Sequence, residues 1–109
     1  MGETRRLSFA AAAVLLAASH GHQYGFDIIG ATGLPAGTVY PVLRRLEDAG
    51  YFRSQWEDAG VAQREQRPAR KYYELTQAGR TGLEAAVARF PLLQRGARRR
   101  GRATKLRPA

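Results

Sequence analysis

The side chains best suited to binding chemistry lie in the run GTVYPVLRRLEDAGYF, residues 37–52. At about 100° per residue, one side of a helix formed by this run is aliphatic. That side holds Val39, Val42, Leu43 and Leu46. The other sides carry Tyr40, Arg44 and Arg45, whose phenol and guanidinium groups suit phosphate oxygens and base edges in the major groove of DNA. The plainer alternative is that the two arginines only solvate an outer face.

No combination of residues in the sequence is suited to catalysis or to a metal. Cysteine is absent, and the chain offers neither the order of a Ser/His/Asp triad nor a phosphate-binding glycine loop. His20 and His22 supply two imidazoles, fewer than the ligands that zinc needs. Asp27 and Glu74 do not form a carboxylate pair. We therefore expect neither an enzyme nor a cofactor.

The net charge of +9 is concentrated at one end of the chain. Eight basic residues and no acidic ones follow Glu84, and removing these eight charges leaves +1 for residues 1–84. A DNA-binding surface in the folded part must therefore be a local patch. A chain of 109 residues predicts one domain, and the lack of cysteine fits a cytoplasmic protein.

Two helices and a turn are expected to position the tyrosine-arginine helix. Residues 7–19 are apolar nearly all round, which predicts a helix buried on several sides, more completely in a dimer than in a monomer. This segment is shorter than the ~20 residues of a membrane span. Residues 24–32 predict a short second helix, whose core side chains are expected to be Phe26, Ile28 and Ile29. Residues 33–37 predict a Gly- and Pro-rich turn.

The boundaries of the tyrosine-arginine helix follow from its end residues. Thr38 is expected to cap its start, which would place Pro41 in the first turn, where a missing N–H costs nothing. Gly50 is expected to end it in a left-handed conformation. Together with residues 24–37, this gives a helix-turn-helix.

Two aromatic-rich strands, residues 51–57 and 70–76, are predicted next. They would form a hairpin joined by a long polar loop, residues 58–69, so that the helix-turn-helix carries a wing. Strand alternation assigns Tyr73 to the core and leaves Tyr72 open. Trp56 either packs beneath the wing or contacts an effector.

A last helix is expected to begin after Thr76, its cap, and to be interrupted by Pro91. We place the folded domain at residues 1–90 and a basic tail at residues 91–109. Such a tail cannot bury enough apolar surface to order itself. It is either an additional arm for DNA or a solubilising end.

Three blocks of the sequence resemble the PadR-like transcriptional regulators: YGFDII from Tyr24, TGLPAGTVYPVLRRLEDAGYF from Thr32, and RKYYELTQAG from Arg70. The resemblance implies a mainly α fold with a small β-hairpin (α+β), a winged helix-turn-helix that dimerises through its first and last helices. It also implies a homodimeric repressor that binds a palindromic operator in double-stranded DNA and is released by an effector.

The resemblance also implies roles for individual residues. The expected DNA contacts are Tyr24, Thr38, Val39, Tyr40, Arg44, Arg45, Arg67, Arg70 and Lys71. The expected dimer contacts are Leu7, Ala11, Val14, Leu15, Leu83, Val87 and Phe90. A small aromatic effector is a candidate partner, with Trp56 as its contact. The interrupted last helix departs from the long final helix of the family, which puts an effector pocket in doubt.

A different class of function fits the same residues. The tyrosine-arginine face and the basic hairpin could instead bind an acidic protein surface, without sequence-specific binding to DNA. Arg67, Arg70 and Lys71 would then be ordinary solvated side chains of a hairpin. A comparison of binding to specific and random DNA separates these two interpretations.

Overall fold

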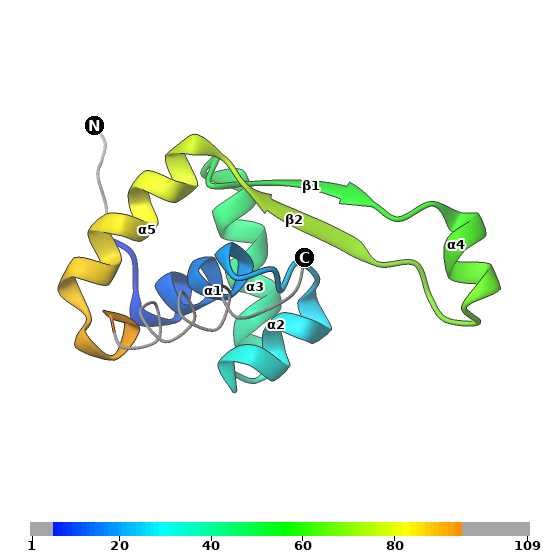
Figure 1. Cartoon of the computed structure of the whole chain (residues 1–109), viewed down its shortest axis with the longest axis horizontal. Helices are drawn as coiled ribbons and strands as arrows, with labels where there is room; N and C mark the ends of the chain where they lie inside the picture. Colours follow the sequence, from blue (N-terminus) through cyan, green and yellow to red (C-terminus); the bar gives the residue numbers. More distant parts are fainter. Residues whose placement is uncertain (1–5, 95–109) are drawn as a thin grey trace, which may run out of the picture.

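The computed structural model describes residues 6–94 and shows a helical body from which a two-stranded wing projects (Figure 1). The elements in order are α1 (Phe9–Ser19), α2 (Gly25–Thr32), α3 (Ala36–Asp48), β1 (Phe52–Trp56), α4 (Ala59–Arg64), β2 (Lys71–Leu75) and α5 (Gln77–Arg89). The predicted mainly α fold with a small hairpin is confirmed. Within the described residues, no helix combines the length and apolar character of a membrane span.

Helix α1 runs through the centre of the body because its small and aliphatic side chains let neighbours approach from several directions. It packs against α2, α3, α5 and β2. Ser8 caps its start by accepting a hydrogen bond from the Ala11 N–H at 3.0 Å. The expected dimer contacts Ala11, Val14, Leu15 and Leu83 are buried within this one chain, so they build the core rather than a surface for a second copy.

Helices α2 and α3 form the predicted helix-turn-helix, with corrected boundaries. Helix α3 begins at Ala36 after Pro35, two residues before the expected cap, so Pro41 lies inside the helix and not in its first turn. Gly50 has the expected positive φ of 86°. Phe26 is 76% exposed, so its assignment to the core is wrong, whereas Ile28 is fully buried.

The wing is an antiparallel pair of strands that runs in register from Phe52 opposite Leu75 to Trp56 opposite Lys71. The segment between the strands is not the predicted polar loop throughout, because it contains α4 at the far end of the wing (Figure 1). Asp58 caps this helix by accepting the Gly60 N–H at 2.9 Å. Tyr73 is buried in the core, as predicted.

Helix α5 returns to the body and lies beside α1. Its predicted cap is confirmed, since Thr76 accepts the Gly79 N–H at 3.1 Å. The body continues past the expected boundary at residue 90: residues 91–94 form a further helical turn, and Leu93 is buried against Ala12 and Ala86. The arginine-rich part of the predicted tail, residues 95–109, lies outside the described residues.

Candidate nucleic-acid interface

Helix α3 presents the expected polar face to the outside. Tyr40 is 51% exposed, and Arg44 and Arg45 are exposed as well. Thr38 is half-buried, but Val39 is 0% exposed. Val39 therefore cannot contact DNA as expected, and it anchors the helix to the core instead. No carboxylate among residues 6–94 forms an ion pair with either arginine, so both charges are available to a partner.

The Tyr40 ring lies against the start of α2 because the residue there has no side chain. A Cβ atom added to Gly25 would overlap the edge of this ring and come within 2.9 Å of the phenol oxygen. Gly25 is therefore a positioning residue that the sequence reasoning missed. The missed signal is its place directly after Tyr24, at the first position of a helix, where glycine is not the favoured residue.

The wing meets the start of α2 through aromatic side chains. The Tyr24 and Tyr72 rings pack edge to face at 5.7 Å, and the Tyr73 N–H donates to the Gln23 carbonyl at 2.7 Å. The guanidinium of Arg70 lies over the Tyr24 ring, 4.1 Å from its centroid. The structure thus brings the expected contacts Tyr24 and Arg70 together, on the same side as Tyr40.

Lys71 ties the wing to the C-terminal half of α3. Its Nζ atom is 3.4 Å from Glu47 Oε1 and lies over the rings of Trp56 and Tyr73. Ser54 donates to the same carboxylate at 2.5 Å. This hydrogen bond, more than the nearby ammonium, lowers the pKa of Glu47. The charge of Lys71 is therefore partly matched by α3 itself.

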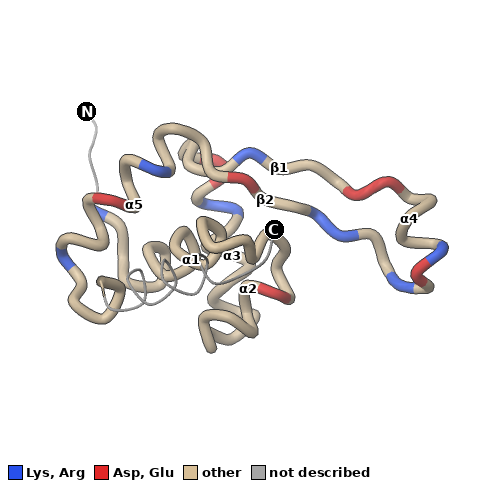
Figure 2. The backbone as a smooth tube through the Cα atoms, in the orientation of Figure 1, with Lys and Arg blue, Asp and Glu red and all other residues tan. Residues whose placement is uncertain are grey.

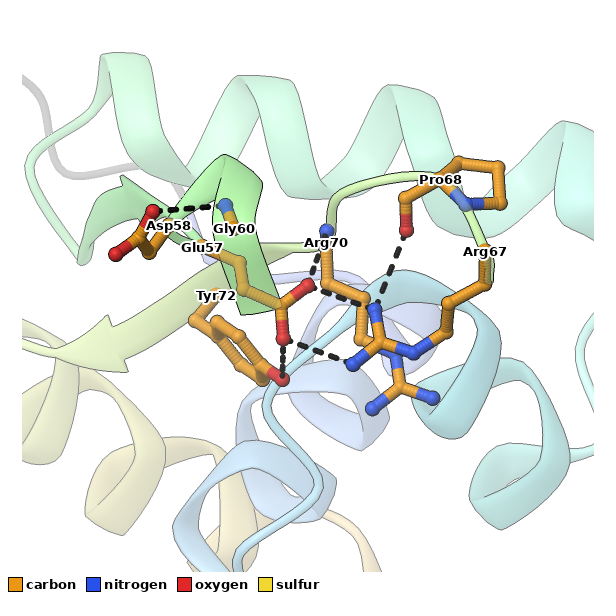
Figure 3. Close-up of polar contacts among 7 residues, drawn as sticks. All are labelled: Glu57, Asp58, Gly60, Arg67, Pro68, Arg70 and Tyr72. Carbon is orange, nitrogen blue, oxygen red and sulfur yellow. Dashed lines mark hydrogen bonds and ion pairs between the residues drawn. The ribbon is translucent and has the colours of Figure 1, made fainter. Parts of the chain in front are cut away.

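Arg67 differs from the other expected wing contacts because a carboxylate holds its guanidinium (Figure 3). Arg67 donates from Nη1 to Glu57 Oε1 at 2.7 Å and from Nη2 to Oε2 at 2.8 Å. These bonds are the main reason why the pKa of Glu57 is lowered to about 2. They also raise the pKa of Arg67. The structure favours an internal role for Arg67 over the expected contact with DNA.

A hollow of about 610 Å³ lies between the start of α2, α3 and the wing. Its walls include Tyr24, Phe26, Tyr40, Trp56, Arg70 and Lys71. Trp56 is 63% exposed and faces this hollow, so the expectation that it packs beneath the wing is wrong. Its expected contact with an effector stays a prediction. The volume of the hollow and its aromatic walls with a few cationic groups are typical of sites that bind small ligands.

The charge of this surface is local and mixed. Figure 2 shows basic segments on α3 and at the start of β2, with acidic segments along the wing. Residues 57–71 contain four basic and three acidic residues, a net charge of +1. Attraction to a polyanion therefore depends on which cations lack a carboxylate partner. Among the expected contacts within residues 6–94, Arg44 and Arg45 form no ion pair with a carboxylate, and Arg70 forms none within 4.0 Å although its charge also acts on Glu57.

The family assignment rests on most of the described chain. The model of the transcriptional regulator PadR-like family matches residues 14–85. The chain belongs to the PadR-like family. Members of this family are DNA-binding regulators of transcription and not enzymes. The PadR-like match includes the whole helix-turn-helix and the wing, which are the elements that line the hollow. Comparison with curated proteins gives no match.

Solved structures share the fold of this PadR-like chain. A PadR family regulator from Eggerthella lenta is 26% identical, with a TM-score of 0.56 over 87% of this chain and 82% of its own. One from Clostridium difficile is 21% identical, with a TM-score of 0.63 over 84% and 97%. BpsR from Bordetella bronchiseptica is 22% identical, with a TM-score of 0.66 over 84% of this chain. The match covers only 61% of the BpsR chain.

Proposed function

We propose that the chain is a homodimeric, cytoplasmic repressor that binds a palindromic operator and is released from it by an effector. The observation that carries this proposal is that Tyr40, Arg44 and Arg45 are all exposed on α3, and that Tyr40 lines the same hollow as Arg70 of the wing. Guanidinium groups on a helix edge suit guanine edges and phosphates, and a wing cation suits the backbone beside them.

A two-fold dimer would set the spacing of the two α3 helices on DNA. Two copies of α3 must lie about 34 Å apart to enter successive major grooves, which requires a palindromic operator. The surface that favours a second copy lies at the start of α1 and the end of α5. There Phe9 is 41% and Leu92 65% exposed, and the rings of Phe9 and Phe90 pack edge to face at 5.4 Å.

The expected dimer contacts that remain at this surface are Leu7, Val87 and Phe90. All three are partly buried against α1 and α5 and keep some exposed area. We assign them, together with Phe9 and Leu92, to the proposed interface between two copies.

Release by an effector follows from the same symmetry. A ligand that favours a different spacing of the two α3 helices weakens DNA binding, and a coupling of 1–3 kcal/mol changes affinity ~5–150-fold. The DNA binding of BpsR is regulated by 6-hydroxynicotinic acid, which supports a small planar ligand here. Trp56 is the proposed contact because its exposed ring faces the hollow.

The proposal is tested by selecting duplexes from a random pool with the purified protein. We expect a palindromic sequence, bound by wild type in preference to its shuffled counterpart. Tyr40→Ala is expected to lose that preference, and Arg44→Ala to weaken binding to both duplexes, whereas Arg80→Ala, an exposed arginine on α5, is expected to change neither. No preference at any salt concentration would contradict the proposal and favour binding to an acidic protein surface.

A further inference from the structure

The outer end of the strand pair, where the segment with α4 begins, is closed by a carboxylate that the DNA-binding surface does not use. Glu57 follows β1, and its side chain is 8% exposed. It accepts two hydrogen bonds from Arg67, one from the Arg70 N–H at 3.2 Å and one from the Tyr72 hydroxyl at 3.4 Å (Figure 3). Four donors on one covered carboxylate make a clasp, which we define as Glu57 with these three partners.

The geometry of the clasp is specific to a carboxylate and a guanidinium. The two parallel N–H to oxygen bonds from Arg67 use the planar fork of arginine, which lysine cannot reproduce. The Glu57 N–H also donates to the Arg70 carbonyl at 2.7 Å. The backbone pairing of the wing therefore continues past Trp56 and Lys71, and the segment that carries α4 is closed at its base.

The clasp reaches the helical body through two side chains. Arg70 has its backbone N–H on Glu57 and its guanidinium over the Tyr24 ring. Tyr72 has its hydroxyl on Glu57 and its ring against the same Tyr24. Arg70 and Tyr72 therefore connect Glu57 to Tyr24 at the start of α2.

We propose that Glu57 is a positioning residue for sequence recognition, which fixes the wing through Arg67 and so holds Arg70 beside Tyr24 and α3. This inference rests on the proposed binding to DNA. It assigns Arg67 to the clasp rather than to a phosphate. It also explains why a wing that approaches a polyanion contains a covered carboxylate.

Simple electrostatics makes the opposite prediction. Removing an acid near DNA raises affinity for every sequence, because one repulsive charge is lost. If Glu57 positions the wing, its loss lowers affinity for the selected operator while affinity for random DNA does not fall. The ratio of the two affinities separates these cases.

The test compares Glu57→Gln with Glu65→Gln, a matched control that removes the same charge from an exposed position on the wing. We expect Glu65→Gln to raise binding to selected and shuffled duplexes by the same factor. We expect Glu57→Gln to lower the ratio by ~5-fold or more, the lower end of measured couplings between sites. Equal ratios in the two variants would overturn the inference.

A charge-neutral variant and a second readout make the test independent of folding and of the proposed function. Arg67→Lys keeps the net charge but loses the fork, so it is expected to lower the ratio as Glu57→Gln does. Hydrogen exchange at the Arg70 N–H is expected to be faster in both variants, with the exchange of α1 unchanged. If wild type selects no DNA, the proposed function fails, whereas unchanged exchange at Arg70 would refute the clasp itself.

Discussion

Substitution of Gly25 by alanine tests whether the position of Tyr40 determines DNA binding. The added methyl group would overlap the Tyr40 ring and touches no other side chain as closely. Because this ring is half exposed, it can rotate into solvent without moving the backbone. In this variant the Tyr40 phenol is therefore expected to move away from the exposed side of α3, while the fold is retained.

The magnitudes follow from this geometry. Alanine in place of glycine stabilises the middle of a helix by about 0.5–1 kcal/mol, so the gain at the first position of α2 is at most this, and a strained tyrosine rotamer costs about 0.5–1.5 kcal/mol. The free energy of unfolding of Gly25→Ala is therefore expected to stay within about 1.5 kcal/mol of wild type. Removing a side chain's hydrogen bond to a base or phosphate costs about 1–3 kcal/mol of binding, a fall of ~5–150-fold in affinity.

The assay is fluorescence anisotropy with the selected operator, paired with urea unfolding. Gly30→Ala is the matched control, since it lies in the same helix and a Cβ there meets nothing within 4 Å. It is expected to be slightly more stable and to bind normally. In a double-mutant cycle, Gly25→Ala is expected to add nothing to Tyr40→Ala. Full affinity in Gly25→Ala, or additive losses in the cycle, would refute the reasoning.

Three further predictions concern stability, salt and pH. Gly79→Ala would drive a Cβ into a backbone carbonyl and is expected to destabilise by about 1–3 kcal/mol in urea unfolding, whereas Gly82→Ala, with nothing closer than 3.6 Å, is not. Arg44→Ala is expected to reduce the log–log salt slope by about 0.9 for each phosphate that the arginine neutralises; an unchanged slope would show that Arg44 does not bind the DNA backbone, and Arg80→Ala is the control. The clasp's contribution to stability is complete above the ordinary carboxyl pKa of 4.5 and is lost as the pH falls toward the lowered pKa of Glu57, about 2. Tryptophan fluorescence is therefore expected to stay constant from pH 5 to 8 and to change less below that range in Glu57→Gln than in wild type, because Glu47, whose partner Lys71 lies over Trp56, also has a lowered pKa and titrates in both; a transition near neutral pH would contradict the assignment.

The sequence predicts the elements whose periodicity is strong. The aliphatic side of α3 and the capping of α5 by Thr76 follow from local spacing and local hydrogen bonds, and the structure confirms both. The assignment of Val39 to DNA came from the resemblance and conflicted with that spacing. The spacing was right, because a side chain cannot fill the core and contact a groove at once.

The parts that sequence reasoning missed depend on contacts between distant residues. Glu57 and Arg67 are ten positions apart, and nothing in their local pattern shows that one carboxylate gathers donors from the loop and from β2. Helix α4 has only six residues, too few for a helical period to show in the sequence. Phe26 is of a residue type usually found in the core, but it lies on the exposed side of the short helix α2. Such side chains are placed by tertiary packing rather than by local propensity.

The central claim is that the outer edge of α3 touches the bases of the operator, and crosslinking tests it most directly. A photoreactive amino acid at position 40 is predicted to crosslink to bases of the selected duplex in two clusters about 34 Å apart, one per half-site. The same group at position 80, on α5, is predicted to give no base crosslinks. Equal yields from both positions, or none from position 40, would contradict the claim.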